Sequence, residues 1–194
     1  MAWKNDQVSQ GETEYIINVA RDCLKLSGDL VEMGCYKGDT SLMLADILKN
    51  TEKRLWIYDS FEGLPEKMKE DESVLGEDFK SGELAVTKRE VKERFLKAGL
   101  KVPVIKKAWF FELRVEDMPV KIAFAFLDGD FYESIRDSLK IIDSLMVFNG
   151  VILIHDYANS ALPGVKKAVD EWLIEKNIVK TEFFESLIKI TINN

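Results

Sequence analysis

The sequence has few of the features that mark disulfide-rich, membrane or secreted proteins. Its two cysteines, Cys23 and Cys35, form neither a C-x-x-C pair nor a zinc-ligand spacing. No apolar run approaches the roughly 20 residues that a membrane helix needs, and the first six residues lack the basic start and apolar run of a secretory signal. These absences exclude a disulfide scaffold and a membrane protein. We expect reduced thiols and a cytoplasmic location.

Positive charge is also scarce. Lys and Arg number 27 against 34 Asp and Glu, which gives a formal net charge of −7. Because such a surface repels polyanions on average, nucleic-acid binding is not expected. With 194 residues, 46% of them hydrophobic and 31% charged, the chain has the composition of an ordinary globule. We expect one domain over residues 1–194, and the sequence leaves open whether it forms a homo-oligomer.

Short apolar runs alternate with amphipathic segments along the chain, a pattern typical of α/β proteins. Strands are expected at residues 30–33, 55–58, 102–105, 122–127 and 151–154, and helices at 12–26, 39–49, 87–98, 132–145 and 165–173. Residues 182–185 and 187–192 are two β-rich runs without a helix between them, which indicates a C-terminal antiparallel hairpin. The sequence therefore predicts a Rossmann-like, mostly parallel seven-stranded sheet with helices on both faces.

Residues 60–86 are polar and show no periodicity. A loop of this length inside a small domain is usually functional. We interpret it as a lid over a site at the carboxyl ends of the strands, where ligands bind in doubly wound sheets.

The turn after the first strand carries a glutamate and two glycines. Glu32, Gly34 and Gly38 give the pattern Glu-x-Gly-x-x-x-Gly, which differs from the G-x-G-x-x-G of a pyrophosphate loop. A negative charge at Glu32 disfavours a diphosphate and suits the ammonium and sulfonium of S-adenosylmethionine. The alternative is that the glycines only shape a turn while Glu32 pairs with a lysine.

The second strand ends at Asp59. A carboxylate at this position can accept hydrogen bonds from both hydroxyls of a ribose. Together with the preceding turn, Asp59 predicts an adenosine-like ligand.

Carboxylates and the single histidine follow the next two buried strands. Asp128 ends the fourth strand, and His155 and Asp156 end the fifth, so these side chains would converge if the strands are neighbours. They would then hold a divalent cation that lowers the pKa of an acceptor hydroxyl, with Asp128 or His155 taking the proton. The alternatives are that His155 only bonds to backbone at the strand end, and that Asp130 caps the following helix rather than binding a ligand.

Four stretches resemble, in order, the motifs of the macrocin O-methyltransferase family. They are Val31-Glu32-Met33-Gly34 with Gly38, residues 58–65 (YDSFEGLP), residues 127–134 (LDGDFYES), and His155-Asp156-Tyr157. The resemblance covers residues 12–172 and implies a class I methyltransferase fold and a metal-assisted, S-adenosylmethionine-dependent O-methyltransferase that acts on a small sugar-like or natural-product acceptor.

The resemblance also implies which residues contact the cofactor. The methionine part would be surrounded by Glu32, Gly34, Gly38, Asp39, Thr40 and Ser41. Asp59 would hold the ribose, and the adenine would lie near Ser60, Phe61, Trp109 and Phe110, although this chain has Ala108 where the family usually has glycine.

One departure from the family concerns the metal. His155 stands where the family usually has the first of two adjacent aspartates. We expect magnesium, but an imidazole ligand shifts the preference toward manganese, iron or zinc, or else His155 leaves the ion and serves as the base. Two other functions stay open: an NAD-dependent dehydrogenase, disfavoured by the missing glycine motif, and a nucleoside-binding protein of the same fold without turnover.

Overall fold

The computed structural model describes residues 7–75, 79–178 and 180–193; the first six residues, on which the absence of a signal was argued, lie outside this part. Within the described residues, seven strands form one sheet in the order β3-β2-β1-β4-β5-β7-β6. The strands are β1 (Asp29–Met33), β2 (Leu55–Asp59), β3 (Val104–Lys107), β4 (Ile122–Leu127), β5 (Met146–Ile154), β6 (Thr181–Phe184) and β7 (Leu187–Thr191). Among these strands, β7 pairs antiparallel with both β5 and β6, and the other neighbouring pairs are parallel, so the predicted sheet and C-terminal hairpin are confirmed.

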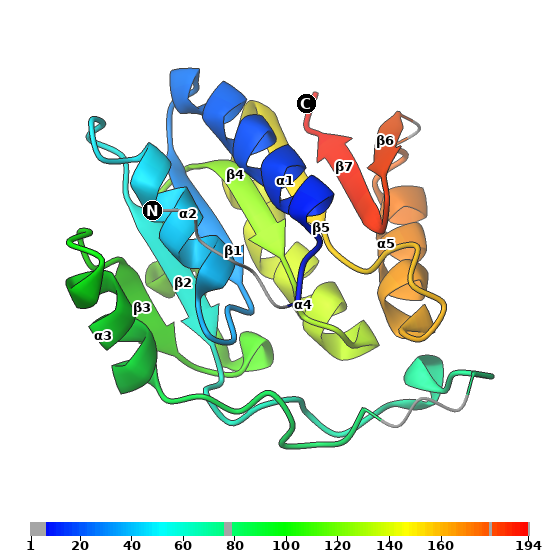
Figure 1. The fold of residues 1–194 in the computed structure, drawn as a ribbon. Helices are drawn as coiled ribbons and strands as arrows, with labels where there is room; N and C mark the ends of the chain where they lie inside the picture. Colours follow the sequence, from blue (N-terminus) through cyan, green and yellow to red (C-terminus); the bar gives the residue numbers. More distant parts are fainter. Residues whose placement is uncertain (1–6, 76–78, 179, 194) are drawn as a thin grey trace.

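Helices cover both faces of the sheet (Figure 1). One face carries α1 (Gln10–Asp22), α2 (Asp39–Ile47) and α3 (Lys88–Lys97), and the other carries α4 (Tyr132–Ile142) and α5 (Pro163–Glu175). No helix within the described ranges combines the length and the apolar character that crossing a membrane requires.

Side chains point alternately to the two faces of each strand, and this explains why the core has two layers. In β4, Phe124 and Phe126 pack toward α1 and α2, whereas Ala125 and Leu127 pack toward α4 and α5. All six residues of β4 are buried, because it is the central strand and has helices on both sides. This confirms the interpretation of the apolar run 122–127.

The bounds of β3 and β5 differ most from expectation. β3 begins at Val104 rather than at residue 102, because Pro103 has no N–H to give to the ladder. Its pairing with β2 places Lys107 opposite Asp59 at the carboxyl end of β2. β5 begins at Met146, before the apolar run at 151–154, and its pairing with β4 is irregular near Asn149, a residue in the left-handed region at φ 60°.

The segment 60–86 lies along the carboxyl ends of the strands, at the lower edge of Figure 1; residues 76–78 of it are outside the described part. It contains a 3-10 turn, Lys69–Asp71, whose Asp71 is 2% exposed. Asp71 accepts hydrogen bonds from the backbone N–H groups of Tyr132 (2.7 Å) and Met68 (3.0 Å). The segment is thus attached to the start of α4, beside the edge of the sheet where the functional residues were expected.

Candidate active site

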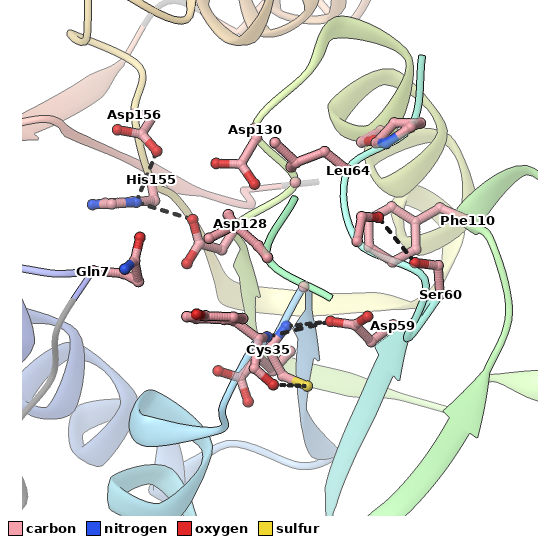
Figure 2. A pocket seen from close by; sticks show the side chains of 18 of the residues that line it. Gln7, Cys35, Asp59, Ser60, Leu64, Phe110, Asp128, Asp130, His155 and Asp156 are labelled. Carbon is pink, nitrogen blue, oxygen red and sulfur yellow. Dashed lines mark hydrogen bonds and ion pairs between the residues drawn. The ribbon is translucent and has the colours of Figure 1, made fainter. Parts of the chain in front are cut away.

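A cavity of about 400 Å³ lies at the carboxyl ends of β1, β2, β4 and β5. Figure 2 shows side chains from these strand ends directed toward it. Among the described residues, nine acidic side chains line the cavity: Glu32, Asp39, Asp59, Glu83, Asp128, Asp130, Glu133, Asp137 and Asp156. Against them stand Lys37 and His155. Such a wall favours a ligand that carries positive charge.

Glu32 lies deepest in this wall. Its side chain is 1% exposed and accepts a hydrogen bond from the hydroxyl of Ser41 on α2. Burial raises the pKa of the Glu32 carboxyl well above its usual range, and the nearby charges of Asp128 and Asp59 add to this shift. The partner of Glu32 is therefore a serine hydroxyl rather than the lysine of the alternative interpretation.

The two glycines of the first turn, Gly34 and Gly38, fit their positions for different structural reasons. Gly34 has φ 87°, and a Cβ on it would lie 2.0 Å from the backbone oxygen of Asp128, so the exits of β1 and β4 approach too closely for a side chain. Gly38 has φ 81° and forms the N-cap of α2. The turn thereby brings its backbone against the end of β4.

Asp59 joins two loops. Its Oδ2 accepts hydrogen bonds from the backbone N–H groups of Cys35 (2.8 Å) and Tyr36 (3.3 Å), and its Oδ1 accepts one from Phe61 (2.7 Å). Because a carboxylate offers roughly four lone-pair sites, about one acceptor site is left for a ligand, on Oδ1. The structure thus leaves room for one ribose hydroxyl, where the sequence suggested two.

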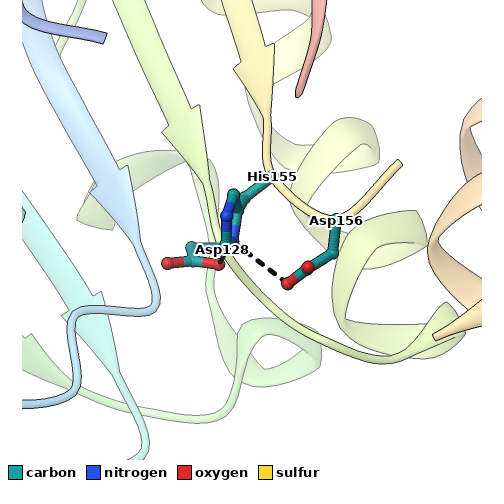
Figure 3. A group of neighbouring side chains, drawn as sticks. All are labelled: Asp128, His155 and Asp156. Atoms are coloured by element: carbon teal, nitrogen blue, oxygen red, sulfur yellow. Dashed lines mark hydrogen bonds and ion pairs between the residues drawn. The ribbon is translucent and has the colours of Figure 1, made fainter. Parts of the chain in front are cut away.

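The strands β4 and β5 are neighbours, with Leu127 opposite Ile154, and they bring Asp128, His155 and Asp156 together (Figure 3). The His155 Nδ1 lies 2.9 Å from Asp128 Oδ1 and 3.0 Å from Asp156 Oδ2. The other oxygen of Asp156 accepts a hydrogen bond from the side chain of Asn159 (2.8 Å). The convergence expected from the order of the strands is therefore present.

His155 also approaches a third carboxylate. Its Nε2 lies 3.6 Å from Glu12 Oε2, and its side chain is 7% exposed. Burial lowers the pKa of the imidazole, but the carboxylates of Asp128, Asp156 and Glu12 outweigh burial and shift the pKa upward. The ring is therefore surrounded by three carboxylates, in contrast to the alternative that it only bonds to backbone.

Most of the predicted site residues line the cavity, namely Glu32, Gly34, Asp39, Thr40, Asp59, Ser60, Trp109, Phe110, Asp128, His155 and Asp156. Three lie outside the lining. Gly38 and Ser41 support it from α2, and Phe61 packs into the core beneath α1 and α2. Asp39 is paired with Arg94 of α3, so its charge is partly compensated.

Several residues around the site were not foreseen, or were foreseen in another role. Asp130 lines the cavity with φ 60°, while Asp71 bonds the first amide of α4, so capping by Asp130 was the wrong alternative. Tyr132 and Tyr157 bond to Glu171 and Asp170 on α5 and do not belong to the lining. Leu64, Pro65, Phe79 and Leu84 give the cavity an apolar wall from the segment 60–86, for which the only signal was the length of that loop.

The arrangement can be compared with known proteins. A model of the family described as Macrocin-O-methyltransferase (TylF) matches residues 13–186. The chain belongs to this family. A tetracenomycin-C 4'-O-methyltransferase of Streptomyces olivaceus, named for a rhamnosyl-bearing compound, is 33% identical over 142 residues, which are 69% of this chain and 54% of that protein. The demethyldecarbamoylnovobiocin O-methyltransferase of Streptomyces niveus is 29% identical over 75% of this chain and 58% of its own length, so the chain spans little more than half of these relatives.

Solved structures share the fold of this macrocin O-methyltransferase family member. The O-methyltransferase NovP superposes with a TM-score of 0.81 at 24% identity, covering 95% of this chain and 80% of that chain. The calicheamicin methyltransferase CalS11 gives 0.75 at 17% identity over 94% and 79%. An O-methyltransferase from Bacillus cereus, solved in complex with SAH, gives 0.67 at 11% identity over 98% and 84%. The class I methyltransferase fold expected from the sequence is confirmed.

Proposed function

We propose that this chain transfers a methyl group from S-adenosylmethionine to a hydroxyl oxygen of a small, sugar-like acceptor. The observation that carries the proposal is the acidic cavity at the carboxyl ends of β1, β2, β4 and β5 in a member of the macrocin O-methyltransferase family. The names of the two curated relatives, both O-methyltransferases, support the reaction class, and the rhamnosyl group in the first name supports a sugar-like acceptor.

The residues of the first two strand ends fit the donor. When bound, S-adenosylmethionine supplies an electrophilic methyl group on a positively charged sulfur. Glu32, with Gly34, Asp39 and Thr40 beside it, would hold the charged methionine part, because a buried carboxyl recovers its ionised form next to a cation. Asp59 Oδ1 would hold the ribose, and Trp109 and Phe110 offer aromatic surface to the adenine.

Asp128, His155 and Asp156 fit a divalent cation. Their candidate ligand atoms all lie within 4.8 Å of one another, and two of the three residues offer carboxylate oxygens, the ligands that Mg²⁺ prefers. A bound cation would lower the pKa of the acceptor hydroxyl and orient its oxygen. Magnesium accords with the two carboxylates, and manganese accords better with the imidazole.

Asp128 is the better placed of the two candidate bases. Its side chain is 22% exposed and faces the cavity, whereas the His155 side chain is 7% exposed and lies among carboxylates. The Asp128 carboxylate can therefore take a proton from an acceptor hydroxyl, while His155 holds its place beside it. Methyl transfer then depends mainly on in-line positioning of the two substrates.

Calorimetry and turnover together test the proposal. We expect S-adenosylhomocysteine, the product left after the donor has lost its methyl group, to bind with measurable heat, and NAD⁺ to give none. Labelled methyl transfer to a panel of monosaccharides and polyols, with and without a chelator, then tests the reaction and its need for metal. Uptake of NAD⁺ alone would favour a dehydrogenase, and binding of the methyl donor without transfer to any acceptor would favour a binding protein of the same fold.

A further inference from the structure

Glu12 lies on α1, and its side chain contacts the site although α1 is not one of the elements whose ends form the cavity. Its Oε1 accepts hydrogen bonds from the backbone N–H (3.0 Å) and the hydroxyl of Ser186, in the turn between β6 and β7. Its Oε2 accepts one from the backbone N–H of Ser9 (3.2 Å) and lies 3.6 Å from His155 Nε2. The side chain is thus held from three sides with one oxygen facing the imidazole.

Helix capping alone does not explain this placement. Ser9 and Glu12 form a capping box, in which the glutamate needs only to reach the amide of the N-cap residue. The capping box of α3 does the same with Thr87 and Glu90, and Glu90 is exposed. Glu12 is only 5% exposed, and a buried carboxylate is costly unless a partner compensates its charge. That partner is the imidazole of His155.

The two ring nitrogens of His155 face different groups. Nδ1 is directed at Asp128 and Asp156, and Nε2 is directed at Glu12. A histidine that binds a metal through one nitrogen commonly gives the N–H of the other to a carboxylate, which fixes the tautomer and the orientation of the ring. Glu12 is held in place for this contact by Ser9 and by Ser186, which donate backbone N–H groups to its two oxygens.

We infer that Glu12 is a positioning residue that holds the Nε2–H of His155 and thereby presents Nδ1 to the site shared by Asp128 and Asp156. The inference rests on the proposed function for its consequence, because a correctly oriented Nδ1 matters most when a cation or acceptor is bound. It also gives the C-terminal hairpin a role at the site. Through Ser186, the turn between β6 and β7 fixes the carboxylate that orients a side chain at the end of β5.

The test uses the fact that His155 is the only histidine in the chain. The NMR spectrum of untagged protein labelled with ¹⁵N-histidine contains one pair of ring nitrogen signals. These signals therefore belong to His155 and report which ring nitrogen carries a proton. We compare wild type with Glu12→Gln, which keeps the size of the side chain and removes the charge, and whose amide NH₂ faces the backbone N–H of Ser9 or of Ser186. The matched control is Glu14→Gln on the same helix, an exposed residue that bonds to Gln10. Affinity for Mn²⁺ alone is measured by calorimetry on the same samples.

In the ion-free wild type we expect Nε2 to carry a proton that exchanges slowly enough to be seen. Glu12→Gln should lose that signal and bind Mn²⁺ about ten- to hundredfold more weakly, the usual effect of removing such a partner. Glu14→Gln should retain the signal and bind Mn²⁺ within about twofold of wild type, consistent with the small effect of exposed charges. A wild-type Nε2 without a proton, or a Glu12→Gln protein with an unchanged signal, would overturn the inference.

Two further comparisons distinguish a failure of the proposed function from a failure of the inference about Glu12. If wild type binds no Mn²⁺, the metal-assisted chemistry fails, while the ring-proton measurement in ion-free protein still decides the role of Glu12. If Glu12→Gln does not fold, Ser186→Ala takes its place, because it removes a hydroxyl that holds Glu12 and leaves the charge intact. We then expect a broadened Nε2–H signal, and a sharp, unshifted one contradicts the inference.

Discussion

Replacing Asp59 with alanine should weaken the empty protein as well as its binding of the methyl donor. The carboxylate accepts N–H groups from Cys35 and Tyr36 on the first turn and from Phe61 at the start of the segment 60–86. Alanine leaves three backbone donors without this acceptor. The first turn would then lose its attachment to the end of β2 before any ligand is considered.

The magnitude follows from the number and kind of these bonds. Each hydrogen bond to a charged group contributes about 1.5–3 kcal/mol, but water can enter the cavity and replace part of this, so we expect a total loss of about 2–4 kcal/mol. For a domain of this size the loss corresponds to a fall in Tm of about 5–15 °C. Asparagine should help little, because its amide NH₂ faces a backbone N–H on whichever side it points. Loss of the remaining acceptor on Oδ1 should weaken S-adenosylhomocysteine binding by about 5–150-fold.

Thermal unfolding without ligand and calorimetry with S-adenosylhomocysteine measure the two effects separately. Asp46→Ala is the matched control, since Asp46 is an exposed residue of α2 that pairs with Lys49 at 2.6 Å on the surface. We expect its Tm and its affinity to stay close to those of wild type. If Asp59→Ala unfolds at the wild-type temperature, the carboxylate does not hold the turn, and if its affinity is unchanged, it does not hold the ribose.

Three further substitutions test the surrounding site. Burial raises the pKa of Glu32, so the folded protein binds this proton more tightly than the unfolded chain does. The free energy of unfolding therefore falls as pH rises above about 4.5. Glu32→Gln should unfold at a higher temperature than wild type at pH 7–8, lose this advantage near pH 4, and bind the donor more weakly. Asp71→Ala removes the acceptor for the backbone N–H groups of Tyr132 and Met68, and we expect the free energy of unfolding in denaturant to fall by about 1–2 kcal/mol. Trypsin should also cleave faster within residues 60–86. Unchanged cleavage would show that Asp71 does not anchor the segment. Asp128→Asn should keep donor affinity within about twofold and reduce turnover about 10²–10⁴-fold, and near-normal turnover would exclude it as the base.

The fold was predictable because its signals are local. The apolar run 122–127 identifies a strand covered on both faces, and the absence of a helix between residues 182 and 192 identifies the terminal hairpin. The strand-end positions of Asp59, Asp128 and His155 then followed from the rule that parallel strands end at one edge. Boundaries failed where one residue decides the pairing, as at Pro103 and near Asn149.

The parts of the site that the sequence did not reveal depend on contacts between distant segments. Asp71 and Tyr132 are 61 residues apart, and Glu12 and Ser186 are 174 residues apart. Asp71 belongs to a stretch without periodicity, and Glu12 reads locally as an ordinary capping residue. No local pattern distinguishes Glu12 from the exposed Glu90 of α3; only the packing of the hairpin turn against α1 does.

The acidic wall itself argues for a cationic ligand on energetic grounds. Burial raises the pKa of Asp130 and of Glu32, and in both cases the neighbouring charge of Asp128 raises it further. Such a cluster disfavours the folded state at neutral pH, because the unfolded chain releases these protons at less expense. A fold that needed only stability would place apolar or paired side chains here. Bound positive charge, whether a sulfonium, an ammonium or a divalent ion, would reverse the penalty, so the same carboxylates that weaken the empty protein would strengthen the loaded one. The rise in Tm with S-adenosylhomocysteine, whose ammonium group remains while the sulfonium charge is lost, should therefore be smaller than the rise with S-adenosylmethionine at equal ligand concentration.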